Sequence, residues 1–395
     1  MAIARRVQGA PTVGAVDVFA VLAARLDPEI CEVPAGEAII RLQERDGEAR
    51  DLVLDARGAR LTPVRAARPD AVLSADAATW RGLAHDVRSG MDAYRRGALV
   101  VRGNLHVGVG FIAATAHDTG PGRLRFRQVQ CDVGTVSVLV AGSGPPVLMA
   151  HGLGATKASF LPTVAALAAS HTCIAMDLPG FGDTDKPLFA SYNAAFFSRW
   201  MLSLLDAMGI VTADVIGHSM GGRAAIEFAL LHRERVRRLV LMCPSLAWRR
   251  NREWAALLRL VRPELGMLQI APRAVVERIL ERILPEAGEG WAAAGKDEFL
   301  RAYLTPAGRA AFYAAARQIY LEAPDGAAGF WTRLGELRTP SLWIWGRRDG
   351  LVPAAFQRHV SRSVPEARHV TVESGHVPQL ERPRETHAAI GAFLR

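Results

Sequence analysis

With 395 residues, half of them hydrophobic, the chain is long enough to bury two cores, and we expect two domains. Its formal net charge is +9, yet the basic residues are mostly arginines spread along the whole chain, whereas a nucleic-acid interface gathers them into a stripe with aromatic residues between them. The distribution argues against a nucleic-acid partner and leaves at most a peripheral contact with an anionic membrane surface.

Four widely spaced cysteines, at positions 31, 131, 173 and 243, form no C-x-x-C pair and have no histidine at metal-ligand spacing. We interpret them as free thiols of a reducing compartment and predict no metal site. The N-terminal stretch lacks a small-residue cleavage site, and no run of 18 apolar residues is present to span a membrane. These features predict a soluble cytoplasmic protein.

The first 115 residues have the pattern of a small α+β domain. The expected strands share an alternating apolar pattern and lie at 38–42, 51–55, 59–64, 71–73 and 97–103. The expected helices lie at 16–25, 77–85, 90–96 and 105–114. We find no catalytic constellation here, and we interpret His85, His106 and His117 as isolated structural residues.

Two runs in this part resemble the sterol carrier protein type 2 family: P-D-A-V-L-S at 69–74 and D-A-Y-R-R-G-A-L-V-V-R-G-N at 92–104. The likeness lies in a strand, a helix and the run G-x-L-x-V-x-G-N, and it covers roughly residues 15–115. It implies a five-stranded sheet with helices that enclose an apolar tunnel for a sterol, a fatty acid or an acyl chain. The alternative is a fold kept only for docking or dimerisation. The resemblance implies no individual lipid-contacting residue.

A polar run rich in Gly and Pro at 115–123 separates a first domain, residues 1–122, from a second domain, residues 123–395. In the second domain, buried strands alternate with helices, which predicts a largely parallel sheet with helices on both faces. Helical segments rich in aromatic residues interrupt this alternation at about 245–335, where we expect a cap over the carboxyl ends of the strands. The basic aromatic stretch 248–254 within it is either a lipid contact or a solvated helix face.

The run V-I-G-H-S-M-G-G at 215–222 joins an apolar strand to an Ala-rich helix through G-x-S-x-G. This pattern is typical of a nucleophile elbow, in which a serine on a strained strand-to-helix turn presents its hydroxyl at the end of a sheet. The flanking glycines remove the Cβ atoms that would clash in such a turn. Ser219 is therefore the candidate nucleophile.

A serine nucleophile needs a base and an acid that orients the base. Asp349 and His376 each follow a strand, which predicts that they reach the same sheet edge as Ser219. Glu373 lies close to His376 in sequence and is the alternative acid. The run His151-Gly152-Leu153-Gly154 lets backbone amides approach a substrate, so we predict that the amides of Leu153 and Met220 form the oxyanion hole.

Five motifs occur in order over residues 125–395: H-G-L-G, D-L-P-G-F-G, G-H-S-M-G-G, W-G-R-R-D-G-L-V-P and S-G-H-V-P-Q-L-E-R-P. Together they resemble the capped branch of the α/β-hydrolase superfamily. The resemblance implies an aspartate at the elbow for haloalkane dehalogenases and epoxide hydrolases, and a cysteine for dienelactone hydrolases and polyester synthases. The serine of this chain disfavours all four. Carboxylesterases, monoglyceride-type lipases and carbon–carbon hydrolases of ring-cleavage products remain.

The sequence thus predicts an α/β-hydrolase fold with a helical cap, preceded by a smaller α+β domain that resembles a lipid carrier. Its expected activity is hydrolysis of a lipophilic carboxylic ester through Ser219, His376 and Asp349, with no metal or organic cofactor. One alternative is carbon–carbon cleavage of ring-fission dienoates. Another is lipid transfer by a protein whose hydrolase half is vestigial. Acyl chain length, head group and oligomeric state lie beyond the sequence.

Overall fold

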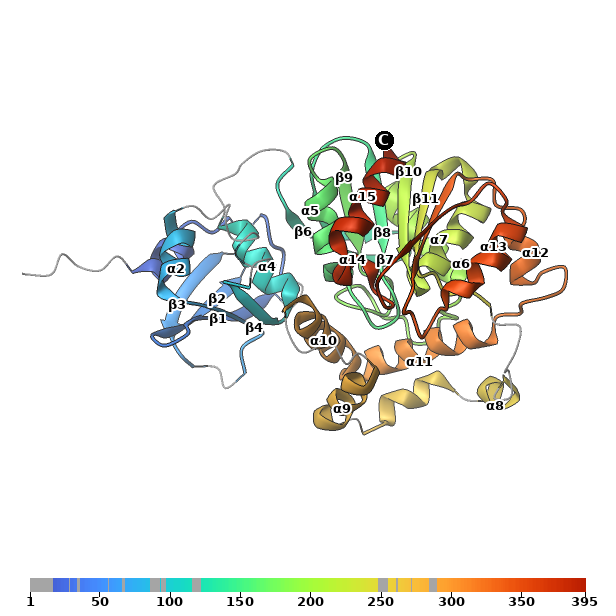
Figure 1. The fold of residues 1–395 in the computed structure, drawn as a ribbon. Helices are drawn as coiled ribbons and strands as arrows, with labels where there is room; N and C mark the ends of the chain where they lie inside the picture. The colour runs from blue at the N-terminus through green and yellow to red at the C-terminus, as the bar shows by residue number, and fades with distance from the viewer. Residues whose placement is uncertain are drawn as a thin grey trace, which may run out of the picture.

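Two sheets organise the chain (Figure 1). The computed structural model describes residues 17–27, 29–33, 36–55, 57–65, 68–85, 93, 97–115, 122–247, 255–260, 262–270, 272–283 and 290–395. A five-stranded sheet belongs to the first domain and an eight-stranded sheet to the second. The predicted helix at 90–96 lies outside the described residues except for residue 93. His117 also lies outside them.

The five-stranded sheet has the strand order β3-β2-β1-β4-β5. Its strands are β1 (Glu37–Glu44), β2 (Ala49–Asp55), β3 (Gly58–Pro63), β4 (Ala71–Ala75) and β5 (Val100–Gly103). β1 pairs antiparallel with β2 and parallel with β4, so the chain crosses over once at the centre of the sheet. Helices α1 (Val18–Ala24), α2 (Ala77–His85) and α4 (Leu105–Ala114) accompany it. The five predicted strands and three of the four predicted helices are therefore present.

Helix α4 joins the first domain to the second. All ten of its residues are buried, and it packs against strands of both sheets. Asn104 caps its first turn by accepting a hydrogen bond from the Val107 amide. Nearby, Cys31 forms a parallel bridge with Phe126 at the edge of the eight-stranded sheet. Apolar side chains of the two domains thus form one continuous core.

The eight-stranded sheet has the order β13-β12-β11-β10-β8-β9-β7-β6. Its strands are β6 (Arg125–Cys131), β7 (Gly134–Ala141), β8 (Pro146–Ala150), β9 (Thr172–Met176), β10 (Ala213–His218), β11 (Val236–Met242), β12 (Ser341–Gly346) and β13 (Arg368–Val372). β8 to β13 run parallel, whereas β7 is antiparallel to both β6 and β9. The predicted, largely parallel sheet is confirmed.

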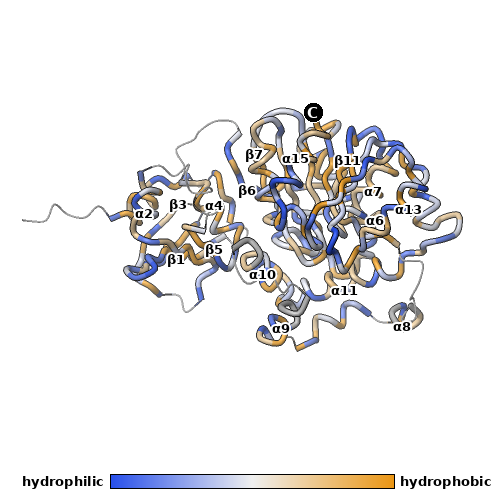
Figure 2. The backbone as a smooth tube through the Cα atoms, in the orientation of Figure 1, coloured by the Kyte–Doolittle hydropathy of each residue, from blue (hydrophilic) through white to orange (hydrophobic). Residues whose placement is uncertain are grey.

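Successive residues of the central strands enter two different cores. Val147 and Met149 of β8 face the core that the first domain shares, whereas Leu148 and Ala150 face the other. Helices α5 (Leu161–Leu167) and α15 (Pro383–Leu394) cover the first face, and α6 (Ala194–Ala207) and α7 (Met220–Leu231) cover the second. Figure 2 shows the hydrophobic residues concentrated in these strands and in α4.

The cap lies between β11 and β12. Its described elements are α8 (Ala255–Leu260), η4 (Pro263–Leu268), α9 (Arg273–Ile283), α10 (Gly290–Tyr303) and α11 (Pro306–Leu321). Figure 1 shows them along one edge of the eight-stranded sheet, with α10 reaching toward the first domain. The next helix, α12 (Phe330–Leu334), packs into the core that α6 and α7 cover.

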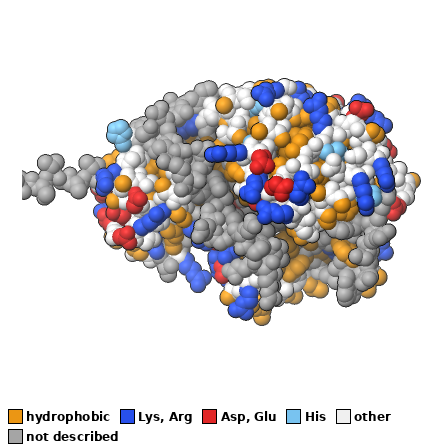
Figure 3. Space-filling view, in the orientation of Figure 1, with side chains coloured by type: hydrophobic (Ala, Val, Ile, Leu, Met, Phe, Trp, Pro, Cys, Tyr) orange, Lys and Arg blue, Asp and Glu red, His pale blue; other side chains and the backbone are white. Residues whose placement is uncertain are grey.

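Basic side chains on the face drawn in Figure 3 are scattered among acidic and apolar ones. Among the helices that the structure describes, none combines the length and the hydrophobicity needed to cross a membrane.

Candidate active site

The turn between β10 and α7 holds Ser219 in a conformation that few residues adopt, with φ 52° and ψ −117°. Neighbouring glycines make this possible. A Cβ on Gly217 would lie 2.6 Å from the Gly221 carbonyl oxygen, and one on Gly221 would lie 2.1 Å from that of Ala150. The Ser219 amide donates to the Met242 carbonyl at 3.0 Å, which fixes the turn against β11. The serine is thus presented as the sequence predicts.

His376 lies within hydrogen-bond distance of both Ser219 and Asp349. His376 Nε2 is 2.9 Å from Ser219 Oγ, and His376 Nδ1 is 2.8 Å from Asp349 Oδ2. The serine is in the elbow, the aspartate follows β12 and the histidine follows β13, so three strand ends bring the three side chains together. The order of contacts suits a serine nucleophile, a histidine base and an orienting carboxylate.

The Asp349 carboxylate is fixed by the loop that carries it. Its Oδ1 accepts hydrogen bonds from the amides of Leu351, at 2.8 Å, and Val352, at 2.9 Å. Burial by itself raises the pKa of Asp349, but the hydrogen bond from His376 and the two amides outweigh it, and the pKa lies below its ordinary value. The carboxylate therefore stays ionised and holds the hydrogen on His376 Nδ1.

Glu373, the alternative acid, is turned away from the histidine. Its side chain is 59% exposed and pairs with Arg347. Because Asp349 makes the contact to His376 and Glu373 does not, the geometry favours Asp349 as the acid.

The Cys243 thiol lies beside this pair, with Sγ, an Asp349 oxygen and a His376 nitrogen all within 4.8 Å of one another. Burial raises the pKa of Cys243 well above its usual value, and the charge of Asp349 adds to this effect. The thiol is therefore protonated.

The loop 151–156 lies beside Ser219, since a Cβ at Gly152 would lie 3.2 Å from the Ser219 Cβ. Leu178 N donates to His151 Nε2 at 2.9 Å, so the His151 hydrogen is on Nδ1, which donates to the Gly152 carbonyl at 2.8 Å. Met220 is the first residue of α7, and its amide has no partner within the helix. These positions agree with the predicted roles of the Leu153 and Met220 amides, which stay predictions.

His218 is a neighbour of the candidate site that the sequence did not indicate. Its Nε2 donates to the His376 carbonyl oxygen at 2.8 Å, and burial lowers its pKa to about 3. The neutral ring thereby fixes the backbone of His376, the candidate base, without adding charge. Its position directly before Ser219 indicates that it lies near the site, but the sequence spacing does not predict the direction of its ring.

Aromatic side chains of the cap cover the loop 151–156. Phe299, Tyr303 and Phe312 pack on one another with ring centroids 5.2–5.7 Å apart. Gly154 has φ 74°, and a Cβ there would lie 2.4 Å from the Phe299 ring, so the ring touches the loop backbone. Ser219 is only 8% exposed beneath this cap.

A cavity of about 140 Å³ opens beside Met220, between α6, α7 and α11. Tyr192, Phe197, Arg223 and Ile319 are among the residues that line it. Arg223 is bound there to Glu227 and Glu322, so its charge is balanced. Ligand pockets commonly measure roughly 300–1,000 Å³, and this cavity alone does not hold a long acyl chain.

The α/β hydrolase fold family matches the sequence over residues 145–269. An uncharacterised protein of Mycobacterium tuberculosis is 30% identical over 301 residues, which cover 70% of this chain and 82% of that protein. The 2-hydroxymuconate semialdehyde hydrolase of Pseudomonas sp. (strain CF600) is 29% identical over 269 residues, which cover 64% of this chain and 88% of the enzyme.

Among solved structures, a membrane phospholipase A described as a bacterial virulence factor superposes with a TM-score of 0.56 at 28% identity, over 69% of this chain and 86% of that one. The family match does not extend to the first domain, so its likeness to sterol carrier proteins stays a prediction. The fold, the elbow and these similarities all point to the same family. The chain belongs to the α/β-hydrolase fold family.

Proposed function

We propose that the protein is a serine hydrolase that cleaves a lipophilic carboxylic ester by way of an acyl-enzyme. The observation that carries the proposal is the unbroken series of hydrogen bonds from Ser219 through His376 to Asp349, on a strained elbow turn. An intact arrangement of this kind also argues against a vestigial hydrolase half.

The geometry supports the following course. His376 Nε2 takes the proton of Ser219 as the hydroxyl oxygen attacks the ester carbonyl, and Asp349 stabilises the imidazolium that forms. The amides of Leu153 and Met220 donate to the oxyanion of the tetrahedral intermediate. The imidazolium then protonates the departing alcohol. A water molecule, activated by the same histidine, releases the acid and restores Ser219.

Three observations favour a lipophilic ester. The cap places Phe299 and Phe312 over Gly154, next to the site of attack. The solved structure of a membrane phospholipase A is among the similar chains. The first domain resembles a lipid-carrier family in sequence and has the five-stranded sheet which that resemblance implies.

Hydrolysis of nitrophenyl esters from acetate to palmitate by the full chain tests the proposal. We expect kcat/KM to rise with acyl length, because added methylenes are buried against the aromatic cap. A fluorescent fatty acid, displaced by unlabelled acid, measures binding in parallel. Cleavage of acetate alone, with no gain for longer chains, contradicts the lipophilic part of the proposal.

Carbon–carbon cleavage of a ring-fission dienoate is the second candidate, and the similarity to 2-hydroxymuconate semialdehyde hydrolase favours it. Such substrates carry a carboxylate, which requires a cation in the site. Arg223 stands one turn after Ser219. Glu227 and Glu322 bind its Nε and Nη2, whereas its Nη1 is buried without a hydrogen-bond partner among the described residues and is available to such a carboxylate. Turnover of a ring-fission dienoate with no turnover of any ester would establish this candidate in place of the first.

A further inference from the structure

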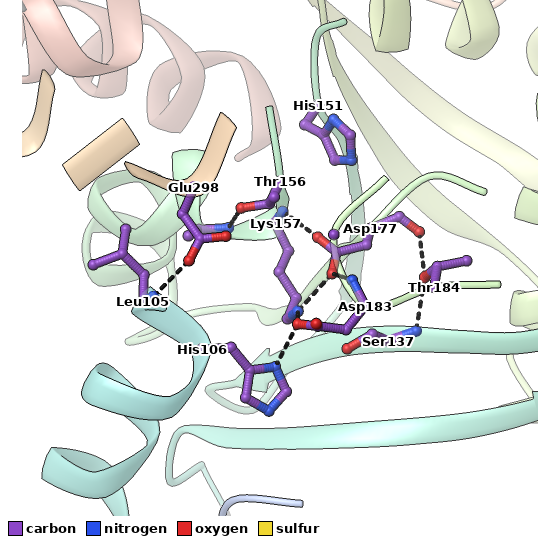
Figure 4. Close-up of polar contacts among 12 residues, drawn as sticks. Leu105, His106, Ser137, His151, Thr156, Lys157, Asp177, Asp183, Thr184 and Glu298 are labelled. Carbon is purple, nitrogen blue, oxygen red and sulfur yellow. Dashed lines mark hydrogen bonds and ion pairs between the residues drawn. The ribbon is translucent and has the colours of Figure 1, made fainter. Parts of the chain in front are cut away.

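A buried polar network connects the first domain, the cap and the loop 151–156 (Figure 4). It involves ionised side chains from three parts of the chain: Arg102 of the first domain; Lys157, Asp177 and Asp183 of the sheet loops; and Asp297, Glu298 and Arg301 of α10. Sequence reasoning identified none of these residues as functional. The Ser219–His376–Asp349 contacts do not include them. Most of them are buried, although the Arg102 side chain is 46% exposed, and this burial of charged groups needs another explanation.

The first domain holds α10 at two points. Arg102, on β5, binds Asp297 in a bidentate ion pair with distances of 2.6 and 3.1 Å, and the Gly103 amide donates to the same carboxylate at 3.0 Å. Glu298, the next residue of α10, accepts a hydrogen bond from the amide of Leu105, the first residue of α4. Both carboxylates are almost fully buried. The start of α4 and the end of β5 thus fix the position of the cap helix.

One turn later, α10 reaches the loop that follows β9. Arg301 donates to Glu298 at 3.0 Å and to both oxygens of Asp183, at 2.7 and 3.2 Å. Asp183 Oδ2 also lies 3.5 Å from Lys157 Nζ and 3.5 Å from His106 Nδ1 of α4. A single carboxylate therefore contacts side chains from all three parts of the chain.

Lys157 directly follows the loop 151–156 and links it to Asp183 and Asp177. Its Nζ lies 2.6 Å from Asp177 Oδ2, and its amide donates to Asp177 Oδ1 at 2.7 Å. The other end of the loop is held by the bond from Leu178 N to His151. Both ends are thus fastened to residues 177–178, while Phe299 of α10 touches the middle at Gly154.

Opposite charges are paired throughout the network. Arg301 and Lys157 bind Asp183, Glu298 and Asp177, and the half-exposed Arg102 and Arg273 lie 2.6 and 3.7 Å from Asp297. His106 is neutral, since burial lowers its pKa to about 4. The buried members of this multiply bonded group favour one arrangement, because moving Lys157, Asp177 or Asp297 would leave a charge unpaired in the interior.

We propose that the first domain is a fixed positioning element of the active site: through Arg102, Glu298 and Asp183 it sets α10 and Lys157, and these set the loop that supplies the oxyanion hole. The proposal rests on the proposed serine-hydrolase function. In it, Arg102 and Lys157 are positioning residues that act through the loop backbone and do not contact the substrate.

The experiment measures two quantities in the full chain: the rate at which a fluorophosphonate labels Ser219, and kcat and KM for a short nitrophenyl ester. Arg102→Gln is the principal variant, because Arg102 lies on β5 outside the hydrolase domain. Since displacements of about 1 Å in an active site cost up to roughly a hundredfold, we expect labelling and kcat to fall about tenfold with KM within about twofold. The exposed Arg60 of β3 supplies the control Arg60→Gln, which should leave both unchanged.

Two further variants separate positioning from stability. Arg102→Gln combined with Asp297→Asn removes both charges and leaves two side-chain amides that can hydrogen-bond to each other. This double variant should restore the labelling rate to within about threefold of that of the unaltered chain. Glu298→Gln keeps the oxygen that accepts the Leu105 amide, so it should fold and show a smaller loss in the same direction.

A variant that melts at a lower temperature but labels Ser219 at the full rate below its melting point overturns the proposal, because the first domain then only stabilises the fold. An unchanged rate in Glu298→Gln overturns it as well, even if Arg102→Gln fails to fold. Absence of labelling in the unaltered chain is a different outcome: it contradicts the serine-hydrolase function on which the proposal rests.

Discussion

The choice of acid at residue 349 rests on geometry that single substitutions can test. Asp349 touches His376 Nδ1, whereas the nearby Glu373 pairs with Arg347 at the surface. Replacing Asp349 by asparagine removes the charge that fixes the histidine tautomer, and we expect kcat to fall by about 10⁴-fold. Glu373→Gln is the matched control and should keep kcat within about twofold. If Glu373→Gln were the damaging change, the acid would be misassigned.

His106 should make stability depend on pH in mildly acidic solution. Its pKa is about 4 in the folded chain and about 6.5 when unfolded, because burial opposes its charge, although Asp183 lies close by. The unfolded state therefore binds the proton first, so this contribution to stability is complete above about pH 6.5 and is lost as the pH falls toward 4.

Denaturant unfolding at pH 7 and pH 5 measures this effect. Between these values the unfolding free energy of the unaltered chain should drop by about 2 kcal/mol more than that of His106→Gln, as an order of magnitude. Asp183, Lys157 and the other titrating groups are shared by the two proteins, so their contributions cancel in the comparison. Equal drops would show that His106 is not held neutral by burial.

At the scale of elements, the contact between α10 and the loop 151–156 allows a steric test. A Cβ at Gly154 meets the Phe299 ring at 2.4 Å, and the positive φ adds strain. Gly154→Ala should therefore lower kcat by at least about tenfold. Gly295→Ala, on α10 itself, meets nothing within 4 Å and should stabilise the helix by about 0.5–1 kcal/mol without loss of activity.

Phe299→Ala in the Gly154→Ala background removes the obstructing ring and should recover part of kcat. A double variant no more active than Gly154→Ala would mean that the loop is disturbed by its own backbone strain and not by α10.

The strands and the triad were predictable because they depend on local patterns. Alternation marks β1 to β5, apolar runs mark the parallel strands, and the strand ends place Ser219, Asp349 and His376 at one edge. The network around Lys157 was not predictable in this way. Asp183 and Arg301 lie 118 residues apart, and a buried lysine has the same local signature as an exposed one. His106, interpreted as isolated, in fact lies beside Asp183 and Lys157.

At the scale of the whole molecule, the two domains behave as one packed unit in the structure. The ten residues of α4 are buried between them, and the edge of the larger sheet receives Cys31 as a bridge partner of Phe126. The Gly- and Pro-rich run at 115–123 predicts a boundary between two domains, and composition alone does not reveal what packs across a boundary.

A chain that starts at Arg123 should therefore be unstable. It removes α4, whose ten residues are all buried, and so exposes to water the apolar core that the two domains share, against a typical total stability of about 5–15 kcal/mol. Thermal unfolding should show a fall in Tm of more than about 10 °C, or aggregation. An unchanged Tm would mean that the domains are energetically independent.

The central claim is that Ser219 forms an acyl-enzyme with a carboxylic ester. Rapid acid quenching of the full chain during turnover of a slowly released nitrophenyl ester, followed by peptide mass analysis, tests it directly. The account predicts one acyl group per chain, on the peptide that contains Ser219, and none in Ser219→Ala. Turnover with no acyl group on that peptide, or equal turnover by Ser219→Ala, would contradict it.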